Sequence, residues 1–436
     1  MAKGLNRKEI GDKIHFNSII DKKFKHNRLS VNFVTPLSKE AASQNAVVPF
    51  ILRKGCREYP DFTALNEKLS ELYGATLSAD VSKYSGYQVI EISIRGLDDR
   101  FALDGENITG ECAALLASVV LDPKLDETGV FCKEDTDLEK QYIIDTIESL
   151  INEKRGYAIS QCMQFMCEGE PVAVRRYGYA EDARKITPES AYEAYRNLLK
   201  TAAVEIIFTG SGSPAATEKV FIERFSGLPR NSFGYELVKL RAAAEKISEH
   251  TETMELSQSK LVMGMRTGLY ENAKQLNAAR VFAALFGGTP FSKLFLNVRE
   301  RLSLCYYCAA RFDVATKLLL VDSGIEFQNK QKAQDEIMAQ LKAIQNGQFS
   351  DEELANTKLL VNNSIRATTD SLASIEGWYM AQILRGQNIA PVDDVKNIDA
   401  VTREDVIEAA KAVTLDTVYF LTGVTEERQG GYCSAD

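Results

Sequence analysis

Histidine is scarce in this 436-residue chain, which carries only His15, His26 and His250. No two of them are close enough in the sequence to bind a metal ion from one helix or one hairpin. A site built from histidines that are distant in the sequence stays open, although no pattern favours it. The sequence therefore predicts no local histidine metal centre and no cofactor.

Long apolar runs and an excess of positive charge are also missing. The most apolar stretch, 114–121, is far shorter than the roughly 18 residues that a membrane-spanning helix needs. The first ten residues lack the apolar region of a secretion signal. A net charge of −9 argues against nucleic acid or an anionic membrane as the main partner. We therefore expect a cytoplasmic protein that binds neither.

The eight cysteines are scattered along the chain, without the spacing of a disulfide framework. This pattern is typical of free thiols in a reducing cytoplasm. The one C-x-x-C, Cys305-Tyr-Tyr-Cys308, lies in a predicted strand, where residues three apart point to opposite faces. We interpret it as two buried thiols rather than a redox motif. Phosphate-binding loops and a serine nucleophile elbow are absent from the sequence.

The composition and periodicity indicate a folded protein of mixed class. Hydrophobic residues make up 45% and charged residues 26%, in a chain too long for one ordinary core. Strands are predicted at 29–34, 75–81, 87–95 and 204–209, and helices at 43–54, 61–73, 103–121, 186–200 and from about 136. Pro49 is expected in or near the first turn of its helix. The fold class that follows is α+β.

The same order of elements occurs twice. Residues 186–210 resemble residues 401–423, with Thr187 matching Thr402 and Gly210 matching Gly423. The helix and two strands at 61–95 have a counterpart at 290–325. A chance resemblance between two α+β domains is the alternative. The repeat predicts two homologous halves, 1–225 and 256–436, with a polar connector at 226–255.

The stretch 289–307 contains S-x-L-F-x-x-V-R-E-x-x-x-L-x-Y, which is similar to the C-terminal motif of the pitrilysin/insulinase (M16) metallopeptidase family. The resemblance covers nearly the whole chain. It implies two halves that face each other as a clamshell, each a mostly antiparallel sheet packed with helices.

Active members of that family bind zinc through His-x-x-Glu-His on an N-terminal helix and a more distant glutamate. With Lys54-Gly55 giving the register, the motif falls on 46–50, which reads Ala-Val-Val-Pro-Phe. The ligand positions are then Ala46 and Phe50, and the position of the catalytic base is Pro49. The distant ligand falls on Thr146, seven residues after Glu139. The resemblance therefore implies that the zinc site has been lost.

The resemblance also implies that Arg299 and Tyr306 bind substrate. In active members an arginine and a tyrosine at these positions hold the peptide near the zinc, the arginine by its hydrogen-bond donors and the tyrosine by its hydroxyl. The alternative is that Arg299 is a solvated helix charge and Tyr306 a core-filling strand residue.

We expect a catalytically inactive subunit that contributes these residues to a zinc-bearing partner chain, as a heterodimer that binds a peptide substrate. A non-proteolytic, homo-oligomeric peptide-binding or scaffold protein is the second hypothesis. An active protease with unfamiliar ligands is the third.

Overall fold

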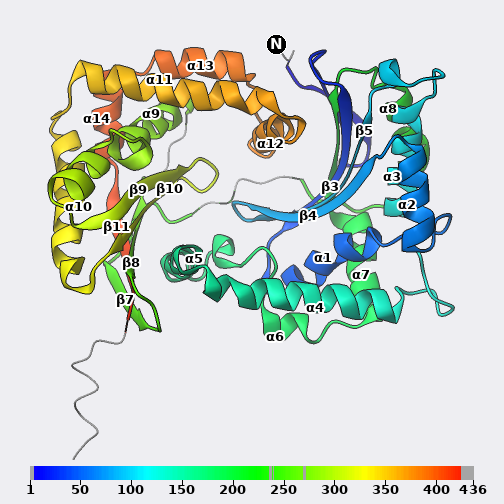
Figure 1. The fold of residues 1–436 in the computed structure, drawn as a ribbon, viewed down its shortest axis with the longest axis horizontal. Coiled ribbons are helices and arrows are strands. Elements are labelled where there is room, and N and C mark those ends of the chain that lie inside the picture. Colours follow the sequence, from blue (N-terminus) through cyan, green and yellow to red (C-terminus); the bar gives the residue numbers. More distant parts are fainter. Residues whose placement is uncertain (1–3, 235–237, 239, 269–271, 424–436) are drawn as a thin grey trace, which may run out of the picture. The chain divides into compact units, whose positions relative to one another are not determined.

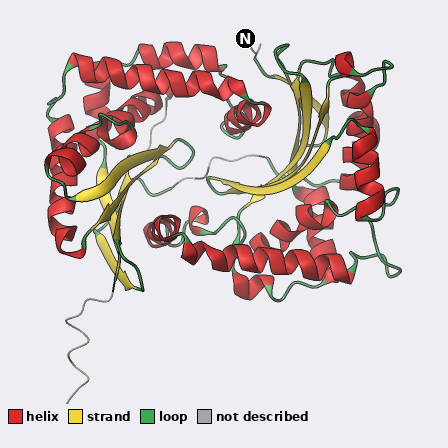
Figure 2. Cartoon of the chain, viewed as in Figure 1, coloured by secondary structure: helices red, strands yellow, loops and turns green. Residues whose placement is uncertain are grey.

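The computed structural model describes residues 4–234, 238, 240–268 and 272–423 (Figure 1). It contains two β-sheets, each packed with helices, so the predicted α+β class is confirmed (Figure 2). The chain forms two compact units whose segments interleave along the sequence. Unit 1 comprises Met1–Ser149, Glu170–Val238 and Ala367–Pro391, and unit 2 comprises Leu150–Gly169, Lys239–Arg366 and Val392–Asp436.

The sheet of unit 1 has the strand order β1-β2-β6-β3-β5-β4. Its strands are β1 (Asn6–Gly11), β2 (Ile14–Ile20), β3 (His26–Pro36), β4 (Thr76–Tyr84), β5 (Tyr87–Leu97) and β6 (Ala203–Gly210). The β2–β6 pair is parallel and all other pairs are antiparallel.

The sheet of unit 2 has the order β7-β11-β8-β10-β9. Its strands are β7 (Ser248–Thr253), β8 (Ser259–Arg266), β9 (Cys305–Asp313), β10 (Leu318–Ile325) and β11 (Thr414–Thr422). The β7–β11 pair is parallel and the rest are antiparallel. Without β1, the two sheets therefore share one strand order and one pattern of directions, as two homologous halves require.

The helices surround these sheets. Those of unit 1 are α1 (Lys39–Leu52), α2 (Phe62–Glu71), α3 (Ile108–Leu121), α4 (Lys133–Ser149), α6 (Ala180–Ala183), α7 (Pro188–Thr201), α8 (Ala215–Phe225) and α12 (Leu372–Ile383), with short turns η1 (Asp99–Phe101), η3 (Pro171–Ala173) and η7 (Thr368–Asp370). Those of unit 2 are α5 (Lys154–Met166), α9 (Ala273–Ala283), α10 (Lys330–Gln345), α11 (Asp351–Ala367), α13 (Pro391–Asp399) and α14 (Arg403–Lys411). Unit 2 also has the short turns η2 (Leu150–Asn152) and η6 (Phe327–Asn329) and the π-helical segments η4 (Ala284–Gly288) and η5 (Phe295–Arg301).

The residues matched in the sequence repeat occupy equivalent places. Thr187 is the N-cap of α7 and Thr402 is the N-cap of α14, and each forms a reciprocal capping box with the residue three positions on. Each helix leads directly into a buried strand, β6 or β11. The residue bounds predicted for the halves, 1–225 and 256–436, stay a prediction, as does their clamshell arrangement.

Three local predictions were wrong in detail. Helix α1 begins at Lys39, with Ser38 as its N-cap, so Pro49 lies in its last turn rather than its first. Helix α3 begins at Ile108, because the side chain of Asn107 caps it by accepting from Gly110 N, and the stretch before it is not helical. Strand β7 lies within the predicted connector 226–255, where its polar sequence concealed it.

The sheet of unit 1 has one apolar and one polar face. Leu29, Val31 and Phe33 of β3 belong to the main core, which also contains residues of α1 and α3. The alternate residues of the strand, Arg28 and Ser30, point to the opposite face, because strand side chains alternate.

Helix α12 covers that polar face by packing on β3 and β6 (Figure 1). Arg28 is ion-paired with Glu376 of α12, and the hydroxyl of Ser30 donates to the same carboxylate. Arg28 also donates to Glu91 of β5 at 2.6 Å. The polar residues of the strands thus find charged or polar partners under the helix, which is the condition for burying them.

Helix α5 has the corresponding place in unit 2, where it packs on β8, β10 and β11. Ala158 and Cys162 of α5 form a small core with Val262, Tyr419 and Leu421. Helix α5 follows α4 in the first half of the sequence and covers the sheet of unit 2, whereas α12 follows α11 in the second half and covers the sheet of unit 1. The two helices therefore occupy equivalent places on equivalent sheets. Within the described ranges no helix is long and apolar enough to cross a membrane.

Replacing Glu376 with Gln should change how stability depends on pH. Burial raises the pKa of Glu376 from 4.5 to about 6, against the lowering effect of Arg28. Since the folded pKa lies above the unfolded one, protonation favours the folded state, and this contribution is lost as the pH rises through about 6. Urea unfolding should therefore show that wild type loses about 2 kcal/mol of stability relative to Glu376→Gln between pH 4.5 and pH 7.5.

Glu67→Gln, on the exposed face of α2, serves as the control. Its free energy of unfolding should differ from that of wild type by a constant amount over this pH range. A constant difference between wild type and Glu376→Gln at all pH values would show that Glu376 does not titrate in this window.

Candidate functional site

Helix α1 carries the five positions aligned with a zinc motif, and all five are buried. Ala46 and Phe50 lie one turn apart on the same helical face, with exposed fractions of 0% and 3%. Pro49 has no backbone N–H to donate within the last turn. Methyl and phenyl groups have no lone pair, so this face of the helix offers no metal ligand.

Aromatic packing joins α1 to α4 at this place. The ring centroid of Phe50 lies 5.3 Å from that of Tyr142 and 6.5 Å from that of Tyr177, which are separations of attractive aromatic pairs. Thr146 lies one turn after Tyr142 on α4, and its hydroxyl donates to the Tyr142 carbonyl at 2.7 Å. The structure thus brings α1 and α4 together, but through side chains that do not fit a zinc ion.

Lys54 and Glu139, which give the register of the zinc motif and of its distant ligand, contact each other. Lys54 Nζ lies 2.6 Å from the carboxylate of Glu139, which is buried on α4. The lysine compensates a carboxylate that would otherwise be costly to bury. Glu139 is therefore engaged in holding α4 near the end of α1.

Arg299 and Tyr306 lie in unit 2, at the end of η5 and the start of β9. The Arg299 side chain is 42% exposed, and its guanidinium lies over the Phe295 ring, 4.7 Å from the centroid. Its Nε is 3.5 Å from the Glu300 carboxylate. Tyr306 is 63% exposed, so it does not fill the core. Both side chains are accessible to another molecule.

A tight turn fixes these two residues relative to each other. Ser303 adopts the left-handed region with a φ of 50°. Its N–H donates to the Arg299 carbonyl at 3.1 Å, and that of Leu304 donates to the Val298 carbonyl at 3.0 Å. Val298 itself is buried. The strand therefore starts directly against the end of the helical turn.

Gly287 allows the preceding turn, η4, to approach β9. A Cβ atom at this position would lie 2.5 Å from the backbone nitrogen and 2.6 Å from the Cβ of Ala310. Only glycine can come so close to the strand backbone. The glycine thus contributes to the position of β9, although it takes no part in binding.

Strand β9 contains a bulge that the sequence did not reveal. Ile325 of β10 pairs with Cys305 and Gly324 pairs with Tyr307, so Tyr306 is an extra residue without its own partner. The extra residue shifts the alternation of side chains. The prediction that Cys305 and Cys308 point to opposite faces assumed a regular strand, which the bulge interrupts. Of the two thiols predicted to be buried, Cys308 is buried and Cys305 is partly exposed.

The two thiols have different surroundings. Interaction with Cys308 lowers the pKa of Cys305 below its ordinary value, burial opposes this, and Ser323 and the charge of Arg299 add to the lowering. Interaction with Cys305 and burial raise the pKa of Cys308. Cys305 is partly exposed and Cys308 is buried.

Each of the three histidines contacts a different residue of the fold. His15 lies 3.2 Å from Glu205 on the sheet of unit 1, and His250 stacks on Phe165 in unit 2 with ring centroids 3.8 Å apart. The ring of His26 lies 3.4 Å from Arg95. In the part of the chain that the structure describes, no group of three or more His, Cys, Asp or Glu residues is placed to hold a metal ion.

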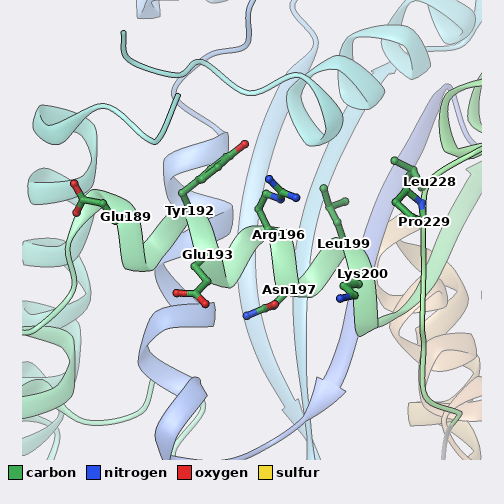
Figure 3. A pocket seen from close by; sticks show the side chains of 9 residues that line it. All are labelled: Glu189, Tyr192, Glu193, Arg196, Asn197, Leu199, Lys200, Leu228 and Pro229. Atoms are coloured by element: carbon green, nitrogen blue, oxygen red, sulfur yellow. The ribbon is translucent and has the colours of Figure 1, made fainter. Parts of the chain in front are cut away.

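A pocket of about 620 Å³ lies along α7 in unit 1 (Figure 3). It is lined by Glu189, Tyr192, Glu193, Arg196, Asn197, Leu199, Lys200, Leu228 and Pro229. The acidic side chains Glu189 and Glu193 lie toward the start of α7 and the basic side chains Arg196 and Lys200 toward its end, so the charges of the lining balance. It contains none of the site residues predicted from the sequence.

The chain resembles known proteins in both sequence and structure. The peptidase M16 inactive domain matches residues 185–360. The chain is similar to YmfF of Bacillus subtilis (strain 168), described as a probable inactive metalloprotease, with 32% identity over 407 residues that cover 92% of this chain and 94% of YmfF.

Two solved structures share the fold. A conserved protein from Enterococcus faecalis V583 is 26% identical, with a TM-score of 0.89 over 97% of this chain and 100% of that one. A chain of complex III2 from Candida albicans is 13% identical, with a TM-score of 0.73 over 97% of this chain and 98% of that one. The second likeness concerns the fold alone, and it shows that a protein of this fold occurs within a complex.

Phe50→Ala should destabilise unit 1. Removing a buried phenyl ring that contacts two tyrosines loses apolar burial and leaves a cavity, at a cost of about 3–5 kcal/mol. Urea unfolding gives the value. Phe62→Ala is the matched control, since Phe62 is 76% exposed on α2, and it should change stability by less than about 0.5 kcal/mol. Equal effects of the two substitutions would contradict a structural role for Phe50.

The purified chain should carry no stoichiometric zinc, because Ala46, Pro49, Phe50 and Thr146 provide no suitable ligand set. Elemental analysis after mild dialysis measures this directly. One zinc ion retained by each chain would show that the metal is held by residues that neither the motif nor the fold indicates.

Proposed function

The chain belongs to the M16 peptidase family, among its inactive members, and from this premise we propose that it is a non-catalytic subunit that contributes peptide-binding residues to a zinc-bearing partner subunit. The partner would supply the metal and the catalytic base, and this chain would supply Arg299 and Tyr306. The pair would act in proteolysis or peptide processing.

The exposure of Arg299 and Tyr306 is the observation that carries this proposal. A guanidinium has several fixed donors and can hold the carbonyl groups of an extended peptide. A phenol hydroxyl can donate to the oxyanion that forms when a peptide carbonyl is attacked. Neither residue fills the core, and a hydrogen-bonded turn holds both in place.

The contrast between the two units supports the same proposal. In unit 1 the aligned zinc positions have become apolar and buried, and Phe50 has become part of an aromatic cluster. In unit 2 the V-R-E-x-x-x-L-x-Y frame is complete around Arg299 and Tyr306. In a chain that served only as a scaffold, we would expect both the zinc positions and the frame around Arg299 and Tyr306 to be lost.

The proposed setting is the cytoplasm, with a heterodimer as the functional assembly. The seven cysteines within the described ranges are free thiols, and five of them are buried, which suits a reducing compartment. A family member that lacks metal ligands needs a second chain for catalysis. Affinity purification of the tagged chain from its source, followed by identification of the co-purifying proteins, should yield a homologue that carries His-x-x-Glu-His.

Arg299→Ala and Tyr306→Phe should each reduce peptide cleavage by the reconstituted pair by about 10²–10³-fold, the usual effect of losing one positioning or oxyanion contact. The chain alone should show no cleavage. Turnover of a quenched fluorescent peptide measures both, and size-exclusion chromatography should show that the variants still assemble.

Two substitutions close by serve as controls. Arg301→Ala removes a guanidinium from the same helical turn, and its side chain is 62% exposed. Tyr307→Phe removes the neighbouring hydroxyl while keeping the ring that Arg155 contacts. Both should leave turnover near the wild-type value. Unchanged turnover in Arg299→Ala and Tyr306→Phe would instead favour the second hypothesis, a homo-oligomeric peptide-binding scaffold.

A further inference from the structure

The sheets of the two units differ at one edge. In unit 1, β1 pairs antiparallel with the outer side of β2. In unit 2, β7 has the place of β2, since each of them pairs parallel with the strand that ends the sequence repeat, β11 or β6. Among the residues that the structure describes, no strand pairs with the outer side of β7 (Figure 1). An edge that is covered in the first sheet is therefore open in the described part of the second.

Hydrogen-bonding groups of the β7 backbone face this open edge. Met254, directly after the strand, donates its N–H to the carbonyl of Thr422 on β11 at 3.0 Å. The backbone groups of successive residues in a strand face opposite sides, so every second residue before Met254 faces β11 and the residues between them face outward. The outward-facing residues of the strand are thus Glu249, Thr251 and Thr253. Their N–H and C=O groups form what we call the β7 edge, which is suited to adding a further strand.

The usual features that prevent strand addition are not found in β7. Its six residues pair with β11 without a register shift, and its sequence, SEHTET, contains neither proline nor lysine. The outer strands β1 and β9, in contrast, are each interrupted by an irregularity in their pairing. Bulges, prolines and lysines are common means by which proteins block an exposed edge. Strand β7 therefore presents a regular edge along its whole length.

The charge around the β7 edge favours a basic partner. Residues 245–255 contain four glutamates and one lysine. The side chain of Glu249 is 55% exposed, and the ammonium group of Lys330 lies 3.4 Å from its carboxylate. An exposed ion pair at this distance contributes little and is easily exchanged. The carboxylates at this edge are therefore available to lysine or arginine side chains of an added strand.

Strand β1 shows within the same chain what such a strand looks like. It is short, extended and antiparallel to its neighbour, and its sequence, NRKEIG, carries two basic residues. Arg7 pairs with the buried Glu205 of β6, and Lys8 pairs with Glu218 of α8, each at 2.5 Å. The covering strand of the first sheet thus combines backbone pairing with basic side chains that contact carboxylates.

We propose that the β7 edge is a docking site for an extended segment of another protein that carries lysine or arginine and pairs antiparallel with β7, as β1 pairs with β2. Backbone hydrogen bonds supply the affinity, and the glutamates select the basic side chains. Strands β7 and β9 are the two outer strands of this sheet, so the segment docks on the edge opposite to that of Tyr306. The inference does not rest on the proposed function.

Fluorescence anisotropy of the full chain with a labelled peptide, Thr-Lys-Val-Arg-Val-Lys-Thr, tests the docking site. We expect saturable binding that weakens as the salt concentration rises. The same peptide N-methylated at all its central residues has lost its backbone donors, and a peptide with glutamate in place of each basic residue has lost the charge complementarity. Each should bind about tenfold or more weakly. Equal binding of the N-methylated peptide would overturn strand pairing, and equal binding of the acidic peptide would overturn the preference for a basic partner.

Thr251→Pro removes one outward N–H from the β7 edge. That N–H faces away from β11, so the substitution breaks no hydrogen bond within the sheet, and proline is tolerated at such positions of an edge strand. Peptide binding should fall by about tenfold or more, whereas Thr251→Val keeps the backbone donor and should bind as wild type does. Urea unfolding checks that both variants fold. Wild-type binding by a folded Thr251→Pro would overturn the proposal.

Hydrogen exchange of the wild-type chain gives a test that needs no variant. The amide protons of Glu249, Thr251 and Thr253 should exchange more slowly when the peptide is bound, because they become donors in the new strand pair. Unchanged exchange at these three residues with peptide bound elsewhere would overturn the docking site. Tyr306→Phe should bind this peptide as wild type does, so this inference and the proposed function can fail separately.

The same measurements separate two other occupants of the edge. A second copy of the chain would give a dimer in size-exclusion chromatography with light scattering, and Thr251→Pro would convert that dimer to a monomer. If the chain's own last residues occupied the edge, the peptide would bind only to a chain that ends at Gly423. We expect neither result, and either one would overturn a basic segment of another protein as the partner.

Discussion

The ion pair between Arg28 and Glu376 joins residues that are 348 positions apart in the chain and links α12 to β3 within unit 1. A glutamate buried alone on the polar face of a sheet would carry a large desolvation cost. Here Arg28 and Ser30 satisfy it, and Arg28 is in turn shared with Glu91. This network specifies which sheet α12 covers. In unit 2 the ion pair between Arg155 and Asp322 has a corresponding place, because it links the start of α5 to β10.

The region aligned with a zinc motif is part of the core of unit 1. A metal site keeps polar ligands close together and gains its stability from coordination. In this chain Phe50 gains stability from burial and from its contacts with Tyr142 and Tyr177. The ion pair between Lys54 and Glu139 holds the same two helices. The framework of α1 and α4 thus persists on packing interactions that require no metal.

The end of η5 and the start of β9 show how one extra residue changes the chemistry of a surface. Without the bulge, Cys305 and Cys308 would lie on opposite faces of the strand. With it, the alternation of side chains shifts by one residue, and Tyr306 lies at the irregular position of an edge strand, where a side chain is not constrained by a cross-strand neighbour. The turn at Ser303 and the close approach of Gly287 hold this arrangement. The exposure and position of Tyr306 therefore arise from one irregularity in the strand pairing.

The sequence by itself determined the α+β class, the repeat that matches Thr187 with Thr402, and the apolar character of positions 46–50, because these depend on residue type and on periodicity within one element. It could not show that α12 covers the first sheet or that α5 covers the second, since those choices rest on pairs such as Arg28 with Glu376, far apart in the chain. It also could not show β7, whose polar residues give no hydrophobic alternation. The bulge at Tyr306 was likewise decided only by the tertiary structure, because a register shift is a property of two paired strands and leaves no mark on either one alone.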